Sequence, residues 1–130
     1  MTVEKAIELA GEMRPNHPYS LRTLQTWLRQ ADAALRAGVI RRSETTEFDQ
    51  VGADVQWDEG ADSLPQESVL LCPVPWDEYY PHYLCAQIDV GLGETERYAN
   101  EMQLANAAAE SFARHIRRSW PVRCEGRLKT

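Results

Sequence analysis

The sequence predicts a mostly α-helical fold: a four-helix bundle-like domain with a C-terminal antiparallel helical hairpin and a long irregular or β-ribbon arm between the second and third helices. Three observations support this prediction. Four segments repeat apolar residues at steps of three and four, capping or helix-breaking residues stand at their ends, and residues 39–75 lack a helical period. A length of 130 residues, with 43% hydrophobic and 26% charged residues, is typical of one globular domain spanning residues 1–130.

The first two helices are expected at about residues 2–13 and 20–37. Thr2 and Ser20 are N-cap residue types, and Gly38 suits the left-handed position after a helix end. The second helix is expected to bury Leu24, Leu28, Ala31 and Leu35 and to expose Arg22, Arg29 and Arg36 on its opposite face. The seven-residue, proline-containing link and the acidic total argue against a DNA-binding helix-turn-helix.

Residues 39–75 are predicted to form an arm that becomes ordered against another chain. They combine turn formers and acidic residues with large apolar side chains, and so long a connection is unusual in a compact domain. Residues 47–51 and 68–72 are β-prone and are predicted to pair as a loose ribbon. The residues expected to contact neighbouring subunits are Phe48, Val55 and Trp57 of the arm, with Tyr79 and Tyr83 beyond it.

The third and fourth helices are expected at residues 77–91 and 94–119, with the turn at Gly91-Leu92-Gly93. A short connection between two long apolar stripes predicts an antiparallel pair. The fourth helix carries the most regular stripe, with heptad-like spacing. The predicted core of the hairpin consists of Tyr80, Leu84, Ile88, Tyr98, Met102, Phe112 and Ile116.

Charge is distributed unevenly along the chain. The net charge is -6, and thirteen acidic residues but no Lys or Arg lie between Ser43 and Glu96. Residues 120–130 form a basic C-terminal tail. Bulk nucleic-acid binding is disfavoured, because it depends on neutralising phosphates with basic side chains. The basic end of the chain is suited to acidic protein surfaces.

No residue pattern points to catalysis. The sequence lacks a phosphate-binding glycine loop, a nucleophile elbow and a zinc-protease motif. Cys72, Cys85 and Cys124 are expected to be buried thiols of a reducing compartment, and His82 is expected to form a surface pair with Asp77 or Glu78. We therefore expect no enzyme activity, no metal and no cofactor. No signal peptide or membrane span is recognised, so synthesis in a cytoplasm is expected.

The segment LLCPVPWDEYYPHYLCAQIDVGLGETERYANEMQLANAAAESFARHIRRSW resembles the second half of head–tail connector (adaptor) proteins of long-tailed bacteriophages and prophages. The resemblance is good over residues 73–120, fair over 1–37 and essentially absent over 39–70. Ala99, Pro81 and the alanines of the last helix depart from the family pattern. The matching positions are Pro73, Pro75, Asp77-Glu78, Tyr80, Tyr83-Leu84, Ala86-Gln87-Ile88-Asp89, Gly93-Glu94, Arg97-Tyr98, Asn100, Asn106-Ala107 and Phe112.

The resemblance implies a structural virion protein at the neck, made in the bacterial host's cytoplasm. Such a subunit forms a homo-oligomeric ring, by analogy of 12 copies, beneath the portal protein; the ring extends the DNA channel and meets a downstream neck, stopper or tail-completion protein. Genomic DNA passes without specific binding. The expected portal-docking residues are Arg114, Arg117, Arg118, Trp120, Arg123 and Arg127. The alternative is a small acidic cytoplasmic regulator or inhibitor that binds a protein partner.

Overall fold

A computed structural model describes residues 1–38 and 69–119, and these residues are mostly helical, as predicted. The elements are the α-helices α1 (Val3–Met13), α2 (Leu21–Gly38), α4 (Tyr79–Gly91) and α5 (Thr95–Ser119), with the 3-10 helix η2 (Trp76–Glu78) before α4. Each α-helix begins and ends within two residues of its predicted boundary. Residues 47–51, the first strand of the predicted ribbon, lie outside the described ranges.

Backbone groups at the ends of the helices are capped by the residue types from which these ends were predicted. The Thr2 hydroxyl accepts a hydrogen bond from the Lys5 amide of α1 at 3.2 Å, and the Ser20 hydroxyl accepts one from the Thr23 amide of α2 at 3.2 Å. Between α4 and α5 the chain turns at Gly93, whose φ is 79°. There the amides of Gly93 and Glu94 donate to the carbonyls of Val90 and Asp89. This pair of bonds is a Schellman motif, which explains the glycine.

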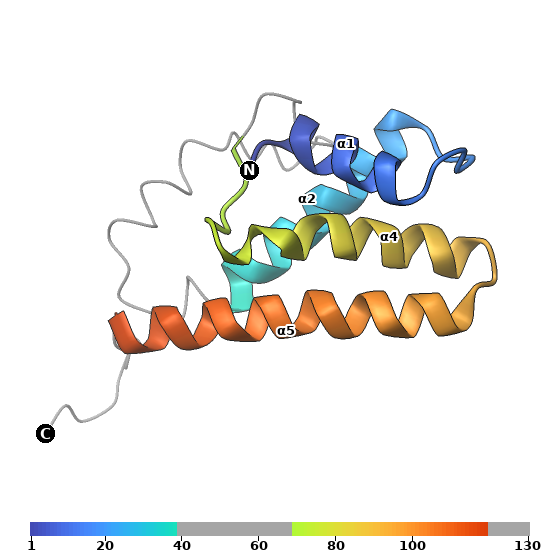
Figure 1. Cartoon of the computed structure of the whole chain (residues 1–130). Coiled ribbons are helices and arrows are strands. Elements are labelled where there is room, and N and C mark those ends of the chain that lie inside the picture. The colour runs from blue at the N-terminus through green and yellow to red at the C-terminus, as the bar shows by residue number, and fades with distance from the viewer. Residues whose placement is uncertain (39–68, 120–130) are drawn as a thin grey trace, which may run out of the picture.

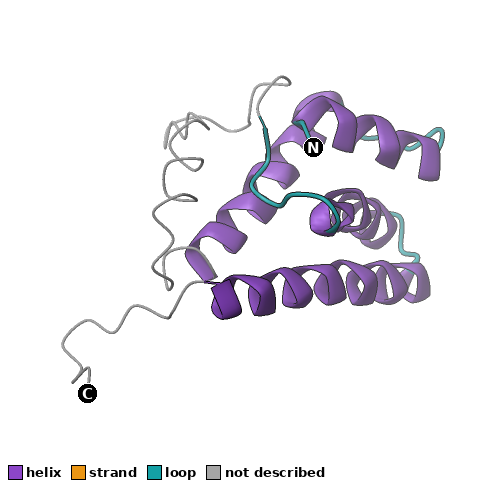
Figure 2. Cartoon of the chain, turned by 60° about the vertical axis from the view of Figure 1, so that its left-hand side comes forward, coloured by secondary structure: helices purple, strands orange, loops and turns teal. Residues whose placement is uncertain are grey.

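Helix α4 is the central element and contacts α1, α2 and α5. Figures 1 and 2 show α4 between α5 on one side and the pair α1 and α2 on the other, and they show α4 and α5 side by side, joined by a short turn. Both views also place the C-terminal end of α2 beside the C-terminal end of α5. Helix α5 therefore lies at the edge of the described fold, with one face on α4.

The last residues of the predicted arm belong to the core. Leu70, Leu71 and Cys72 are at most 2% exposed, and the Leu70 amide donates to the Met1 carbonyl at 2.9 Å. Val69 forms an isolated antiparallel bridge with Thr2. In the described residues, Val69 and Leu70 thus pair with the N-terminus and residues 69–72 do not form a strand, which corrects the end of the predicted arm at residue 75.

The core row of α5 differs from the predicted stripe in its N-terminal half. Tyr80, Leu84, Ile88, Phe112 and Ile116 are fully buried, whereas Tyr98 and Met102 are only partly buried. The α5 row that faces α4 instead runs through Glu101, Ala105 and Ala108, because the inward face of a straight helix drifts by about 20° per heptad relative to a strict heptad stripe. Small alanines at this contact allow α4 and α5 to approach closely.

Tyr79 also differs from its prediction as a contact with a neighbouring subunit. Its side chain is 6% exposed and packs in the core of this chain, with its ring 5.2 Å from that of Tyr80. The Tyr79 hydroxyl donates to the Ala31 carbonyl of α2 at 3.4 Å. The buried Tyr79 side chain of α4 thereby contacts α2 inside the same chain.

Replacing Gly91 with alanine is expected to lower the free energy of unfolding by about 1–3 kcal/mol. An added Cβ would overlap the Tyr19 hydroxyl and lie 2.8 Å from Tyr19 Cζ. Tyr19 also packs edge-on against Trp27, with ring centroids 5.0 Å apart, so its displacement disturbs a second contact. Denaturant unfolding followed by tryptophan fluorescence measures the loss.

Gly11→Ala in α1 is the matched control, because a Cβ at Gly11 meets nothing within 4 Å. This change is expected to stabilise the protein by about 0.5–1 kcal/mol through helix propensity. A Gly91→Ala variant as stable as the parent chain would contradict the packing described here.

Candidate functional site

An interhelical polar cluster joins the loop after α1 to α4 and α5; we define it as Arg14, His82, Asp89 and Glu101. Arg14 Nε donates to Asp89 Oδ1 at 2.8 Å and its NH2 group donates to Asp89 Oδ2 at 2.9 Å, which makes the pair bidentate. The same NH2 group donates to Glu101 Oε1 at 3.1 Å. On the other side of Glu101, His82 Nδ1 lies 2.7 Å from Oε2. The partner of His82 is therefore on α5, and the predicted surface pair with Asp77 or Glu78 is wrong.

The electrostatics of this cluster favour a structural tie. The Asp89 side chain is 0% exposed and that of Arg14 is 17% exposed. The hydrogen bond to Asp89 raises the pKa of the Arg14 guanidinium above its ordinary value, against the opposing effect of burial. A guanidinium held in this way stays charged at all physiological pH values. The four side chains bond to one another, and they hold the loop after α1, helix α4 and helix α5 together.

A second buried network, the Asp32 clasp, consists of Asp32, Arg36, Leu71, Cys72 and Tyr80. Asp32 Oδ1 accepts hydrogen bonds from the Leu71 amide at 3.0 Å and the Tyr80 hydroxyl at 2.6 Å, while Oδ2 accepts one from Arg36 Nε at 3.0 Å. The Tyr80 hydroxyl in turn accepts a bond from the Cys72 amide at 2.8 Å. The clasp fixes the backbone of residues 71–72 between α2 and α4.

Burial decides the chemistry available to the Asp32 clasp. Asp32 and Tyr80 are 0% exposed, and Arg36 is 7% exposed, so the prediction of Arg36 on the solvent face is wrong. Arg36 turns inward because its i,i+4 partner Asp32 is buried. Burial, followed by the nearby Asp32 carboxylate, raises the pKa of Tyr80 well above its ordinary value. The Tyr80 phenol therefore stays protonated and is inaccessible to a substrate, so its role is to stabilise the fold.

The described thiols and the possible metal ligands give no second site. Cys72 and Cys85 are free and buried. Across residues 1–38 and 69–119, no three or more His, Cys, Asp or Glu side chains are grouped as a metal site requires. None of the helices in these ranges is long and apolar enough to cross a membrane.

Stability is expected to fall as the pH rises above about 9, the range in which unfolded thiols and phenols lose their protons. Burial raises the pKa of Cys85 to about 12 and raises the pKa values of Cys72, Tyr79 and Tyr80 above their ordinary values. The unfolded chain therefore holds fewer of these protons than the native chain above pH 9, so alkali favours unfolding. Well below pH 8 both states hold these protons and this effect is absent.

Urea unfolding at pH 8, 9, 10 and 11 measures the slope of stability with pH. Tyr79→Phe removes one of the raised phenols and loses only a 3.4 Å hydrogen bond, so this variant is expected to show a shallower decline. Equal stability of the parent chain at pH 8 and 11 would show that these groups are not buried as described.

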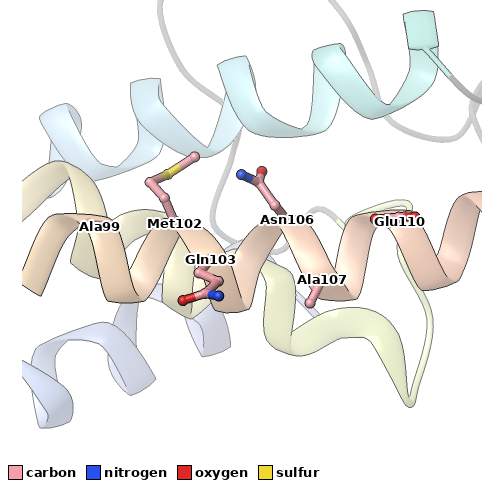
Figure 3. A pocket seen from close by; sticks show the side chains of 6 residues that line it. All are labelled: Ala99, Met102, Gln103, Asn106, Ala107 and Glu110. Atoms are coloured by element: carbon pink, nitrogen blue, oxygen red, sulfur yellow. The ribbon is translucent and has the colours of Figure 1, made fainter.

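Helix α5 presents one long face to solvent, opposite its core row. We define the α5 outer face as the exposed residues Glu96, Ala99, Gln103, Asn106, Glu110, Arg114 and Arg117. A shallow groove of about 490 Å³ runs along its middle, lined by Ala99, Met102, Gln103, Asn106, Ala107 and Glu110. Figure 3 shows Met102 and Asn106 pointing to one side of the helix, and Gln103 and Ala107 pointing to the other.

The predicted partner-binding residues fall into three groups. Arg114, Arg117 and Arg118 are exposed at the end of α5, and Tyr83 is partly buried with its ring 5.9 Å from that of Tyr79. Trp120, Arg123, Arg127, Phe48, Val55 and Trp57 lie outside the described residues. Sequence reasoning missed Arg14, Asp32 and Glu101. The available signal was a charged residue beside or within an otherwise apolar row, as at Asp32 next to Ala31.

Comparisons with protein-family models, with curated proteins and with solved structures found no match for this chain.

Proposed function

We propose that this chain is a head–tail connector, a structural adaptor that forms a ring beneath a phage portal and joins head to tail. The proposal is supported first by the resemblance of residues 73–120 to such proteins. This segment corresponds to η2, α4 and α5, the elements that hold the core together and present the α5 outer face. The resemblance therefore covers both helices of the C-terminal pair and the turn that joins them.

The residues that match the connector pattern have structural roles, which agree with a structural subunit. Tyr80 closes the Asp32 clasp, Asp89 receives the bidentate bond from Arg14, and Gly93 makes the left-handed turn. Each of these three residues supports the fold. The residues left at the surface are then the ones available for partners.

The observation that carries the proposal is the exposed basic end of α5. Arg114, Arg117 and Arg118 are all exposed within two helical turns, and both views place this end beside the end of α2. An arginine group at an element's end is suited to an acidic surface on a larger protein, because charge complementarity speeds association and fixes orientation. The portal is the acidic partner that we propose.

In this proposal the four helices act as one bundle-like block, and Phe48, Val55 and Trp57 of the arm contact neighbouring copies in the assembled ring. A channel wall rich in carboxylates does not hold passing DNA, because like charges give no counterion release. The chain thereby lets the genome pass while its basic end stays on the portal.

Neutralising Arg114, Arg117, Arg118 and Arg123 together with glutamine is expected to weaken portal binding by at least about tenfold at low salt, and by less at high salt because exposed charges are screened. Binding of purified subunit to purified portal, measured over a salt series, tests this. Lys5→Gln with Arg22→Gln is the control, since both charges lie on exposed positions of α1 and α2. Portal binding unchanged by the four substitutions would remove the docking assignment.

Negative-stain images test the ring itself. The adaptor proposal predicts rings or neck complexes when the subunit is mixed with portal. The alternative, a small acidic regulator, predicts a one-to-one complex with a partner and no rings.

A further inference from the structure

We propose that the α5 outer face binds a second copy of this chain in antiparallel orientation, so that the free protein forms a two-fold symmetric dimer. The proposal concerns the free protein and does not rest on the adaptor function. The argument starts from the position of α5 at the edge of the described fold, where only α4 and η2 make substantial contact with it. The α5 outer face lies opposite this contact.

The spacing of the α5 outer face is that of a helix-packing seam. From Glu96 the positions advance by three, four and three residues to Asn106, and then by four, four and three residues to Arg117. Such alternation keeps a row on one side of a helix over several turns. All of these positions are exposed, while Ala105, Ala108 and Phe112 on the opposite side are buried.

The size of the side chains favours close approach in the middle of the row. Ala99, Asn106 and Ala107 are short, and they line the groove described above. Beside the row, Leu104 is 50% exposed and Met102 is partly buried, so apolar area is available at the flank of the contact. A helix seated in the groove would cover Met102, which lines it.

The charges of the row favour antiparallel pairing with a second copy of the chain. The N-terminal end carries Glu96 and the C-terminal end carries Arg114 and Arg117, all of them exposed. When Asn106 of one copy lies opposite Ala107 of the other, Glu96 faces Arg117 twice, once at each end. In the same register Gln103 faces Glu110 and Ala99 faces Arg114. A parallel pair would instead place Arg117 against Arg117 and Glu96 against Glu96, which is repulsive.

A two-fold contact of this kind uses the same surface on both copies. It would cover Arg114 and Arg117, which the adaptor proposal assigns to the portal. Dimer formation and portal binding therefore exclude each other. A dimer would prevent its subunits from entering the ring until the portal displaces the second copy from the arginines.

Sedimentation velocity of the full chain over a concentration series tests the dimer. Arg117→Glu is expected to weaken self-association by about tenfold, because two opposite-charge pairs become like-charge pairs. Glu96→Arg is expected to do the same, and Glu96→Arg with Arg117→Glu together is expected to restore association to within about threefold of the parent chain, since the pairs are re-formed in reverse. Circular dichroism checks that each variant keeps its helical content.

Cross-linking tests the antiparallel register. In a Cys124→Ser background, Ala107→Cys places a thiol close to the two-fold axis and is expected to give one disulfide-linked dimer under oxidation, while Lys5→Cys on α1 is expected to give none. A monomer at every concentration would overturn the proposal, as would a dimer insensitive to both charge reversals. Failure of Ala107→Cys to cross-link in a confirmed dimer would overturn the register. Portal binding, measured separately, decides the adaptor function.

Discussion

Asp32→Ala is expected to lower the free energy of unfolding by about 3–5 kcal/mol, the cost typical of removing one partner of a buried ion pair. Asp32 is 0% exposed and accepts hydrogen bonds from the Leu71 amide, the Tyr80 hydroxyl and Arg36 Nε. Without the carboxylate, the Arg36 charge loses a buried acceptor and the Leu71 amide is left without its bond. Small domains are stable by only about 5–15 kcal/mol, so the variant is expected to be partly unfolded at 37 °C.

Two variants separate charge from hydrogen bonding in the Asp32 clasp. Asp32→Asn retains an acceptor oxygen for Leu71 and Tyr80 but removes the negative charge, so an intermediate loss is expected. Gln30→Ala on the same helix is the control, because Gln30 is exposed and its change is expected to stay within about 0.5 kcal/mol. Urea unfolding of all three against the parent chain gives the comparison. If Asp32→Ala cost no more than Gln30→Ala, the clasp would not stabilise the fold.

Arg14→Ala is expected to cost about 3–5 kcal/mol, because it leaves the Asp89 carboxylate buried without its bidentate partner. The same change removes the bond to Glu101, which is also within 2.7 Å of His82 Nδ1. Arg14→Lys is expected to recover only part of the loss, since an ammonium cannot donate two parallel bonds to one carboxylate.

Asp89 provides an internal comparison between two arginines. Arg97 Nε lies 4.0 Å from Asp89 Oδ1 and its side chain is 52% exposed, whereas Arg14 Nε lies at 2.8 Å. Arg97→Ala is therefore expected to cost at most about 1 kcal/mol. A double-mutant cycle of Arg14→Ala with Asp89→Ala measures the coupling directly. A coupling energy near zero, or equal losses for the two arginines, would contradict the geometry of the cluster.

The helices could be predicted because their signals are local. Thr2, Ser20 and Gly93 act within a few residues of their own positions, through caps and a left-handed turn, so the chain marks its own helix ends. The row of Leu24, Leu28, Ala31 and Leu35 is likewise set by helical spacing alone, and all four side chains are buried.

The polar clusters could not be predicted because their partners are far apart in the sequence. Arg14 and Asp89 are separated by 75 residues, and Tyr80 and Asp32 by 48. Polarity alone places such residues in solvent, as it did for Arg36, and only the packing of α4 against α1 and α2 turns them inward. The burial of Leu70–Cys72 depends in the same way on the N-terminus, since Leu70 bonds to Met1.

The exposed basic end of α5 could be located from the sequence, because the arginines follow a regular helical stripe and precede a proline. The function of that end could not be fixed in the same way. Exposure at Arg114 and Arg117 is compatible with the portal, with a second copy or with both in turn, and the experiments above assign each partner by its own measurement.

The contact between Tyr19 and Gly91 restricts how this protein can diverge. The tyrosine hydroxyl occupies the space that a side chain at position 91 would fill. Among natural variants, residues at these two positions are therefore expected to covary: alanine or serine at 91 should occur only with a shorter side chain at 19. A survey of homologous sequences would display this coupling as a pair of positions that change together although they are far apart along the chain.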